Sequence, residues 1–136
     1  MSFNLKRGAN VNVIEYLSRI QRYDVLSKQL QEIIADFDEK RSRISLSDCT
    51  KEKILAYQKA YRIKIQKYEI EKEKIVSQIN DMPVSLQRQV LFYKYVSNIE
   101  LKDISKLLTY SEQYIRYICS ISHKEFSRLY LERGLK

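Results

Sequence analysis

The chain has 136 residues, enough for one domain or two small ones. Its two glycines, Gly8 and Gly134, stand near the ends and Pro83 is its one proline, which argues against tight β-hairpins between them and predicts an all-α fold. The net charge of +8 suits an anionic partner such as nucleic acid, although a small domain also carries such a charge for solubility alone.

We expect a first long helix over residues 11–44. Its apolar side chains recur at helical spacing and fall within an arc of about 140°, with charged residues opposite. The members of this stripe are Tyr16, Ile20, Tyr23, Leu26, Leu30, Ile33, Ile34, Phe37 and Ile44. A polar break over residues 45–50 follows, with Thr50 as the expected N-cap of the next helix.

A second long helix is expected over residues 51–80. Its apolar stripe consists of Ile54, Tyr57, Tyr61, Ile65, Tyr68, Ile75, Ile79 and Met82. Two stripes of similar length with a short connection predict an antiparallel helical hairpin, and we place this domain at residues 1–82. Four further apolar residues lie outside the stripes: Leu17, Val25, Ile63 and Ile70. They could mediate a homodimer, or they could pack on the C-terminal module.

Basic residues between positions 51 and 67 are interpreted as a solvated face of the hairpin, with a second DNA-contact surface as the alternative. They are Lys51, Lys53, Lys59, Arg62, Lys64 and Lys67.

Pro83 disfavours helix in the residue before it and marks the start of a second domain, residues 83–136. We expect three helices there: residues 85–96 with Ser85 as N-cap, residues 99–108 capped by Asn98, and residues 111–133 with Ser111 as N-cap. The last two have helix-turn-helix spacing. Their predicted buried seam is Ile104, Leu108, Ile115 and Ile118, with small Ser105 where the helices approach closely.

The helix that begins after Ser111 would then present its first turns outward as a recognition helix. Its candidate base-reading residues are Glu112, Gln113, Arg116 and Tyr117. Arginine pairs with guanine, glutamine with adenine, and glutamate accepts from cytosine. The candidate contacts to the DNA backbone are Lys102, Lys106, Ser111, Tyr114, Ser120, Lys124 and Arg128. A plain three-helix bundle without a role in DNA binding is the alternative.

Residues 83–130 resemble region 4 of sigma-70-type factors in the stretches 88–95, 103–105 and 111–118. With the long helical segment ahead of it, the chain is similar to ArpU/RinA/LtrC-type regulators, which are phage-encoded, sigma-like activators of late genes. The resemblance covers about a third of the chain, and it assigns base reading to the same four positions. Thr109 stands where glycine is common in the turn, and because a β-branched residue resists positive φ we expect a reshaped turn.

The resulting expectation is a sequence-specific regulator of transcription that binds double-stranded DNA in the bacterial cytoplasm, with RNA polymerase as a possible further partner. A small-terminase-like assembly subunit and a helical protein-binding adaptor are the alternatives. Cys49 and Cys119 are expected to be reduced thiols, and His123 a surface residue. We expect no metal, no cofactor, no enzymatic activity and no membrane segment, because the sequence has no phosphate loop, ligand cluster or long apolar run.

Overall fold

The computed structural model describes the backbone of residues 2–132 and the side chains of residues 13–132. Over these residues it is all-helical and contains no strand, which confirms the predicted class. Its elements are α1 (Ser2–Arg43), α2 (Asp48–Asn80), α3 (Ser85–Leu91), η1 (Phe92–Val96), α4 (Leu101–Leu108), α5 (Glu112–Phe126) and η2 (Ser127–Leu131). The η segments are π-helical. The expected end of the last helix, Arg133, lies outside the described residues.

Contacts divide the chain into two compact units. Residues 22–73 form one of them, the two-helix unit, and residues 1–21 together with 74–136 form the other, the core unit. This grouping differs from the expected boundary between residues 82 and 83. The physical reason is that Leu17, Ile20 and Ile79 are fully buried within the core unit, so the adjoining ends of both long helices pack with the C-terminal helices.

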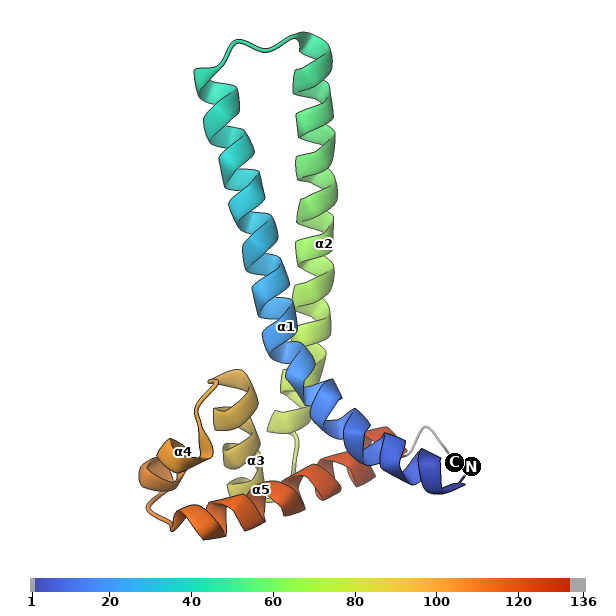
Figure 1. Cartoon of the computed structure of the whole chain (residues 1–136), viewed down its shortest axis with the longest axis vertical. Helices are drawn as coiled ribbons and strands as arrows, with labels where there is room; N and C mark the ends of the chain where they lie inside the picture. The colour runs from blue at the N-terminus through green and yellow to red at the C-terminus, as the bar shows by residue number, and fades with distance from the viewer. Residues whose placement is uncertain (1, 133–136) are drawn as a thin grey trace. The chain divides into compact units, whose positions relative to one another are not determined.

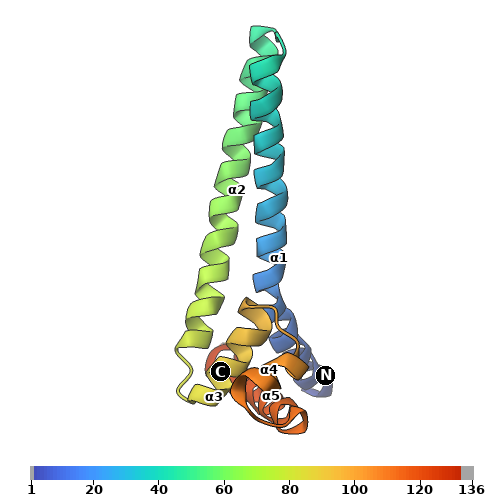
Figure 2. The same cartoon turned by 90° about the vertical axis from the view of Figure 1, so that its left-hand side faces the viewer.

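In the two-helix unit, parts of α1 and α2 lie side by side and run in opposite directions (Figures 1 and 2). The rings of Tyr23 and Tyr68 stack with their centroids 5.7 Å apart, and Lys72 Nζ pairs with Asp24 Oδ1 at 2.8 Å. Both contacts join α1 to α2, and together they determine which residues of the two helices lie opposite one another.

The apolar seam of this unit differs from the prediction at Ile33, Ile44 and Tyr57, which are exposed, whereas Gln58, the neighbour of Tyr57, is buried. Gln58 Nε2 donates to the Ile34 carbonyl oxygen at 3.1 Å and to Asp38 Oδ1 at 2.8 Å. A buried amide is stable when its polar atoms are hydrogen-bonded in this way. Gln58 therefore occupies the inward position that the sequence predicted for Tyr57.

Two helix starts also differ from the prediction. Ser47, not Thr50, caps α2, because its Oγ accepts from the Thr50 amide at 3.2 Å and the helix begins at Asp48. Val84, not Ser85, is the N-cap of α3, and it makes no side-chain capping bond. Ser85 Oγ instead accepts from Gln89 Nε2 at 3.0 Å, within the helix.

The centre of the core unit is Phe126 of α5, which is fully buried. Its ring centroid lies 5.9 Å from that of Tyr16 and 4.8 Å from that of Tyr130. The Tyr16 hydroxyl donates to Gln78 Oε1 at 2.6 Å, so the two long helices are joined beside this ring. The core therefore holds residues 13–20 of α1, the end of α2 and the end of α5 together.

Candidate nucleic-acid interface

The link from α4 to α5 is a short turn with a left-handed residue. Thr109 has φ 60° and ψ 40°, and the Tyr110 amide donates to the Ser105 carbonyl oxygen at 3.0 Å. The expectation that Thr109 would force a different turn is therefore wrong: threonine takes the conformation usually given to glycine, and its Oγ1 donates to the Leu108 carbonyl oxygen at 2.6 Å. Ser111 caps α5 as predicted, since its Oγ accepts from the Tyr114 amide at 3.1 Å.

Asn98 follows Ser97, the C-cap of η1, and does not cap α4, contrary to the prediction. Its φ is 58°, and its Oδ1 accepts from Gln21 Nε2 at 2.8 Å. The N-cap of α4 is Glu100, which makes no side-chain capping bond. Asparagine tolerates the left-handed region better than most residues, which explains its place in this turn.

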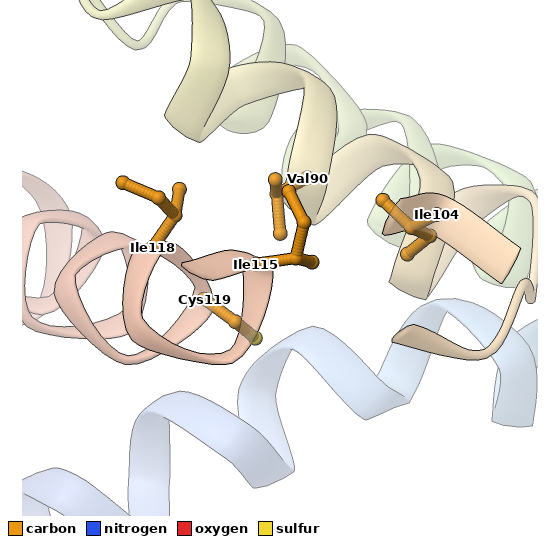
Figure 3. Close-up of a cluster of buried hydrophobic side chains, with 5 residues drawn as sticks. All are labelled: Val90, Ile104, Ile115, Ile118 and Cys119. Carbon is orange, nitrogen blue, oxygen red and sulfur yellow. The ribbon is translucent and has the colours of Figure 1, made fainter. Parts of the chain in front are cut away.

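An apolar cluster lies between α3, α4 and α5. Figure 3 shows Val90 of α3 against Ile115 of α5, with Ile104 of α4 beside them. Ile118 and Cys119 belong to the same cluster, and Leu108 packs against it, so the predicted seam is confirmed. Because the seam buries one face of α5, helical geometry directs the side chains on the remaining faces of this helix away from the cluster.

The candidate base-reading residues lie outside the buried seam of α5, and all four are exposed: Glu112, Gln113, Arg116 and Tyr117. Arg116 Nη2 pairs with Glu112 Oε1 at 2.8 Å, one helical turn away. An exposed pair of this kind contributes little free energy, so it holds the guanidinium only loosely.

The candidate backbone-contacting residues are exposed as well. They are Lys102 and Lys106 on α4, Ser111 at the cap, Tyr114, Ser120 and Lys124 on α5, and Arg128 on η2. Arg128 pairs with Glu125, which lowers the pKa of that carboxyl through their hydrogen bond. Ser120 and Lys124 line one shallow hollow of the core unit. The exposed surface of α4 and α5 thus combines cations, amides and hydroxyls.

Sequence reasoning missed Tyr110 as part of this surface. Its ring centroid lies 5.0 Å from that of Tyr114, which lies 6.3 Å from that of Tyr117. The exposed fractions of Tyr110, Tyr114 and Tyr117 are 48, 41 and 60%. We call these three residues the tyrosine cluster. The three tyrosines are spaced by four and then three residues, as on one side of a helix, and this spacing could have indicated the cluster. It was not recognised because Tyr110 precedes the predicted helix start at Ser111.

His123 is half-buried, whereas the sequence predicted an exposed surface residue. Its Nε2 lies 2.7 Å from the Tyr95 hydroxyl and 3.9 Å from Cys119 Sγ. Burial, with a smaller effect of Lys94, lowers the pKa of His123 to about 4. Burial raises the pKa of the Tyr95 phenol and of the Cys119 thiol. Tyr95 of η1 and Cys119 and His123 of α5 are therefore uncharged at neutral pH.

Comparisons with models of protein families, with curated proteins and with solved structures found no significant match. Across the part of the chain that the structure describes, no helix is long and apolar enough to cross a membrane. Over the same residues, no group of three or more His, Cys, Asp and Glu side chains lies close enough together to hold a metal ion.

Proposed function

We propose that this chain is a sequence-specific regulator of transcription that binds double-stranded DNA through α4 and α5. The observation that carries the proposal is the division of α5 into two faces. One face is buried by the apolar seam, and the other carries Gln113, Arg116 and Lys124, which are exposed among the residues that the structure describes. A helix with such a face, preceded by a short helix and a tight turn, has the form that enters a major groove.

In this proposal the first two turns of α5 read base edges. Arg116 donates to a guanine and Gln113 makes a paired contact with an adenine, while Glu112 accepts from a cytosine. Binding exchanges the Glu112–Arg116 ion pair for contacts to bases, a small cost for an exposed pair. The lysines of α4 and Lys124 contact phosphates on either side and set the register.

The resemblance of residues 83–130 to region 4 of sigma-70-type factors supports this function. Together with the expected long helical segment, it favours a phage-encoded activator of late genes of the ArpU/RinA/LtrC type, a class that would act in the bacterial cytoplasm beside RNA polymerase. In this proposal the protein needs no cofactor and catalyses no reaction, because its contacts to DNA are hydrogen bonds, ion pairs and apolar contacts.

DNA binding is expected to be specific and strongly dependent on salt. The measurement selects fragments of bacterial and phage DNA on the purified chain and then titrates the enriched fragment between about 50 and 200 mM salt. Phosphate contacts by Lys102, Lys106, Lys124 and Arg128 predict a log–log slope of about −3.6 for each bound chain, since each contact contributes about −0.9. Enrichment of a site upstream of an operon supports the proposal, whereas a flat salt response together with no enriched site contradicts it.

A small-terminase-like assembly subunit and a protein-binding adaptor are the competing functions. A terminase subunit would form a ring, so the native mass of the purified chain separates it from a regulator: a monomer or dimer fits the regulator, and eight or more copies fit the ring. An adaptor would bind no DNA site in the selection experiment.

We further propose that the two-helix unit mediates a homodimer. Leu17 cannot contribute, because it is buried inside the core unit. Ile63 and Ile70 can: they are 51 and 68% exposed, and their spacing of seven residues puts them on one face of α2. Burying such side chains contributes roughly 1.5–3 kcal/mol each, enough for a modest contact that would pair two DNA-binding modules.

Replacing both residues, Ile63→Glu and Ile70→Glu, is expected to convert the dimer to a monomer, because four carboxylates would face one another across the contact. Sedimentation equilibrium over a range of concentrations measures the change. Tyr57→Glu is the matched control, since Tyr57 is 55% exposed and lies about 120° or more around the same helix from Ile63 and Ile70, and this variant should stay dimeric. A wild-type chain that is monomeric at the highest concentration would contradict the dimer.

A further inference from the structure

The tyrosine cluster is an apolar surface on an otherwise polar face. Its three rings lie at the start of α5 and in the turn before it, and Leu107 of α4, 56% exposed, adds to the exposed apolar area of the α4–α5 region. None of these side chains belongs to the apolar cluster beneath α5. Contiguous exposed apolar groups of this kind mark sites of interaction more often than not.

Contacts within the cluster order its rings before any partner arrives. Tyr114 lies between Tyr110 and Tyr117, with ring centroids 5.0 and 6.3 Å away. Rings packed in this way lose less conformational entropy on binding than isolated side chains. Because neighbouring rings are tilted against one another by 41° and 39°, they share no flat face, which suits contact with a small apolar group better than stacking on an unpaired base.

A major groove offers one apolar group to such a surface. Guanine, adenine and cytosine present hydrogen-bond donors and acceptors there, whereas thymine also presents its C5-methyl group. Tyr117 directly follows Arg116 and lies one turn after Gln113, so a groove that meets those polar side chains also meets its ring.

We propose that the tyrosine cluster recognises thymine methyl groups and gives the chain a preference for thymine-containing sites. This inference rests on the proposed function, since it assigns to Tyr117, already a base-reading candidate, and to its two neighbours an apolar contact in addition to the hydrogen bonds. Tyr110, which precedes α5, extends the contact beyond the bases that α5 itself reaches. The polar residues of α5 then read donors and acceptors, and the cluster reads the methyl groups between them.

The test compares the enriched double-stranded fragment with the same fragment in which deoxyuridine replaces thymidine. This exchange removes the methyl groups and keeps every hydrogen-bonding group. Burial of one methyl group corresponds to about a fourfold change in affinity, so the wild-type chain should bind the deoxyuridine fragment at least about fourfold more weakly. Tyr117→Ala combined with Tyr110→Ala should weaken binding to the thymidine fragment and bring the ratio of the two affinities close to one.

Two control variants separate this role from a general one. Tyr117→Phe keeps the apolar ring and should keep the ratio. Arg116→Ala should lower the affinity for both fragments and also keep the ratio. Circular dichroism checks that each variant is folded, which the exposure of all three positions leads us to expect.

The outcomes distinguish the two proposals. A folded wild-type chain that binds no DNA removes the proposed function and the thymine preference with it. A chain that binds the thymidine and deoxyuridine fragments equally keeps the proposed function and overturns the role of the cluster. An unchanged ratio in the double alanine variant, or tighter binding to the single-stranded fragment, also overturns it.

Discussion

Replacing Phe126 with alanine is expected to lower the free energy of unfolding of the core unit by about 3–5 kcal/mol. The ring is fully buried and packs against two other aromatic rings, those of Tyr16 and Tyr130. The substitution removes a large apolar surface from the core and leaves a cavity that these neighbours cannot fill. Since domains of this size are commonly stable by only about 5–15 kcal/mol, the variant should be close to unfolding at ambient temperature.

Urea denaturation followed by circular dichroism measures this effect. Tyr117→Ala is the matched control, because it also removes an aromatic ring from α5 but from its exposed face, and it should change the free energy of unfolding by no more than about 0.5 kcal/mol. A Phe126→Ala variant as stable as Tyr117→Ala would mean that α5 does not pack on α1 and the end of α2 as described.

Acid is expected to destabilise the core unit through His123. The pKa of His123 is about 4 in the folded chain, below its ordinary value of 6.5, because burial disfavours the charged imidazolium. The unfolded chain therefore takes up a proton before the folded chain does. The contribution to stability is fully present above pH 6.5 and is lost as the pH falls toward 4. The difference in pKa sets an upper limit of about 3 kcal/mol, and partial solvent access to the ring reduces the expected loss to about 1–2 kcal/mol.

The measurement is the free energy of unfolding at several pH values between 4 and 7, compared with that of His123→Gln. Glutamine can still hydrogen-bond with the Tyr95 hydroxyl but does not titrate, so the variant controls for the carboxylates that titrate over the same range. The wild-type curve should fall more steeply than the curve of the variant. Parallel curves would show that the pKa of His123 is the same in the folded chain as in the unfolded chain.

The sequence by itself determined the helical class and the inner face of the C-terminal helices. The lack of interior glycine and the helical apolar spacing led to long helices, and the spacing of Ile104, Ile115 and Ile118 led to the buried seam that the structure contains. Ser111 was predictable as a cap because its hydroxyl acts on an amide three residues away. Such features depend on residues that are close in the chain, so the helical spacing of apolar residues and the chemistry of a capping side chain are sufficient to predict them.

Other features were decided only by contacts between distant residues. The sequence predicted His123 as a surface residue. Its partial burial became evident only from the structure, in which it forms a hydrogen bond with Tyr95, 28 positions earlier in the chain. Gln58 replaces Tyr57 in the seam because Ile34 and Asp38, on the other long helix, satisfy its amide. Tyr110 joins the other two tyrosines only because a left-handed Thr109 folds the turn. A helical period shows which side of a helix is apolar, but the burial of a polar group depends on partners that only the tertiary structure brings within hydrogen-bonding distance.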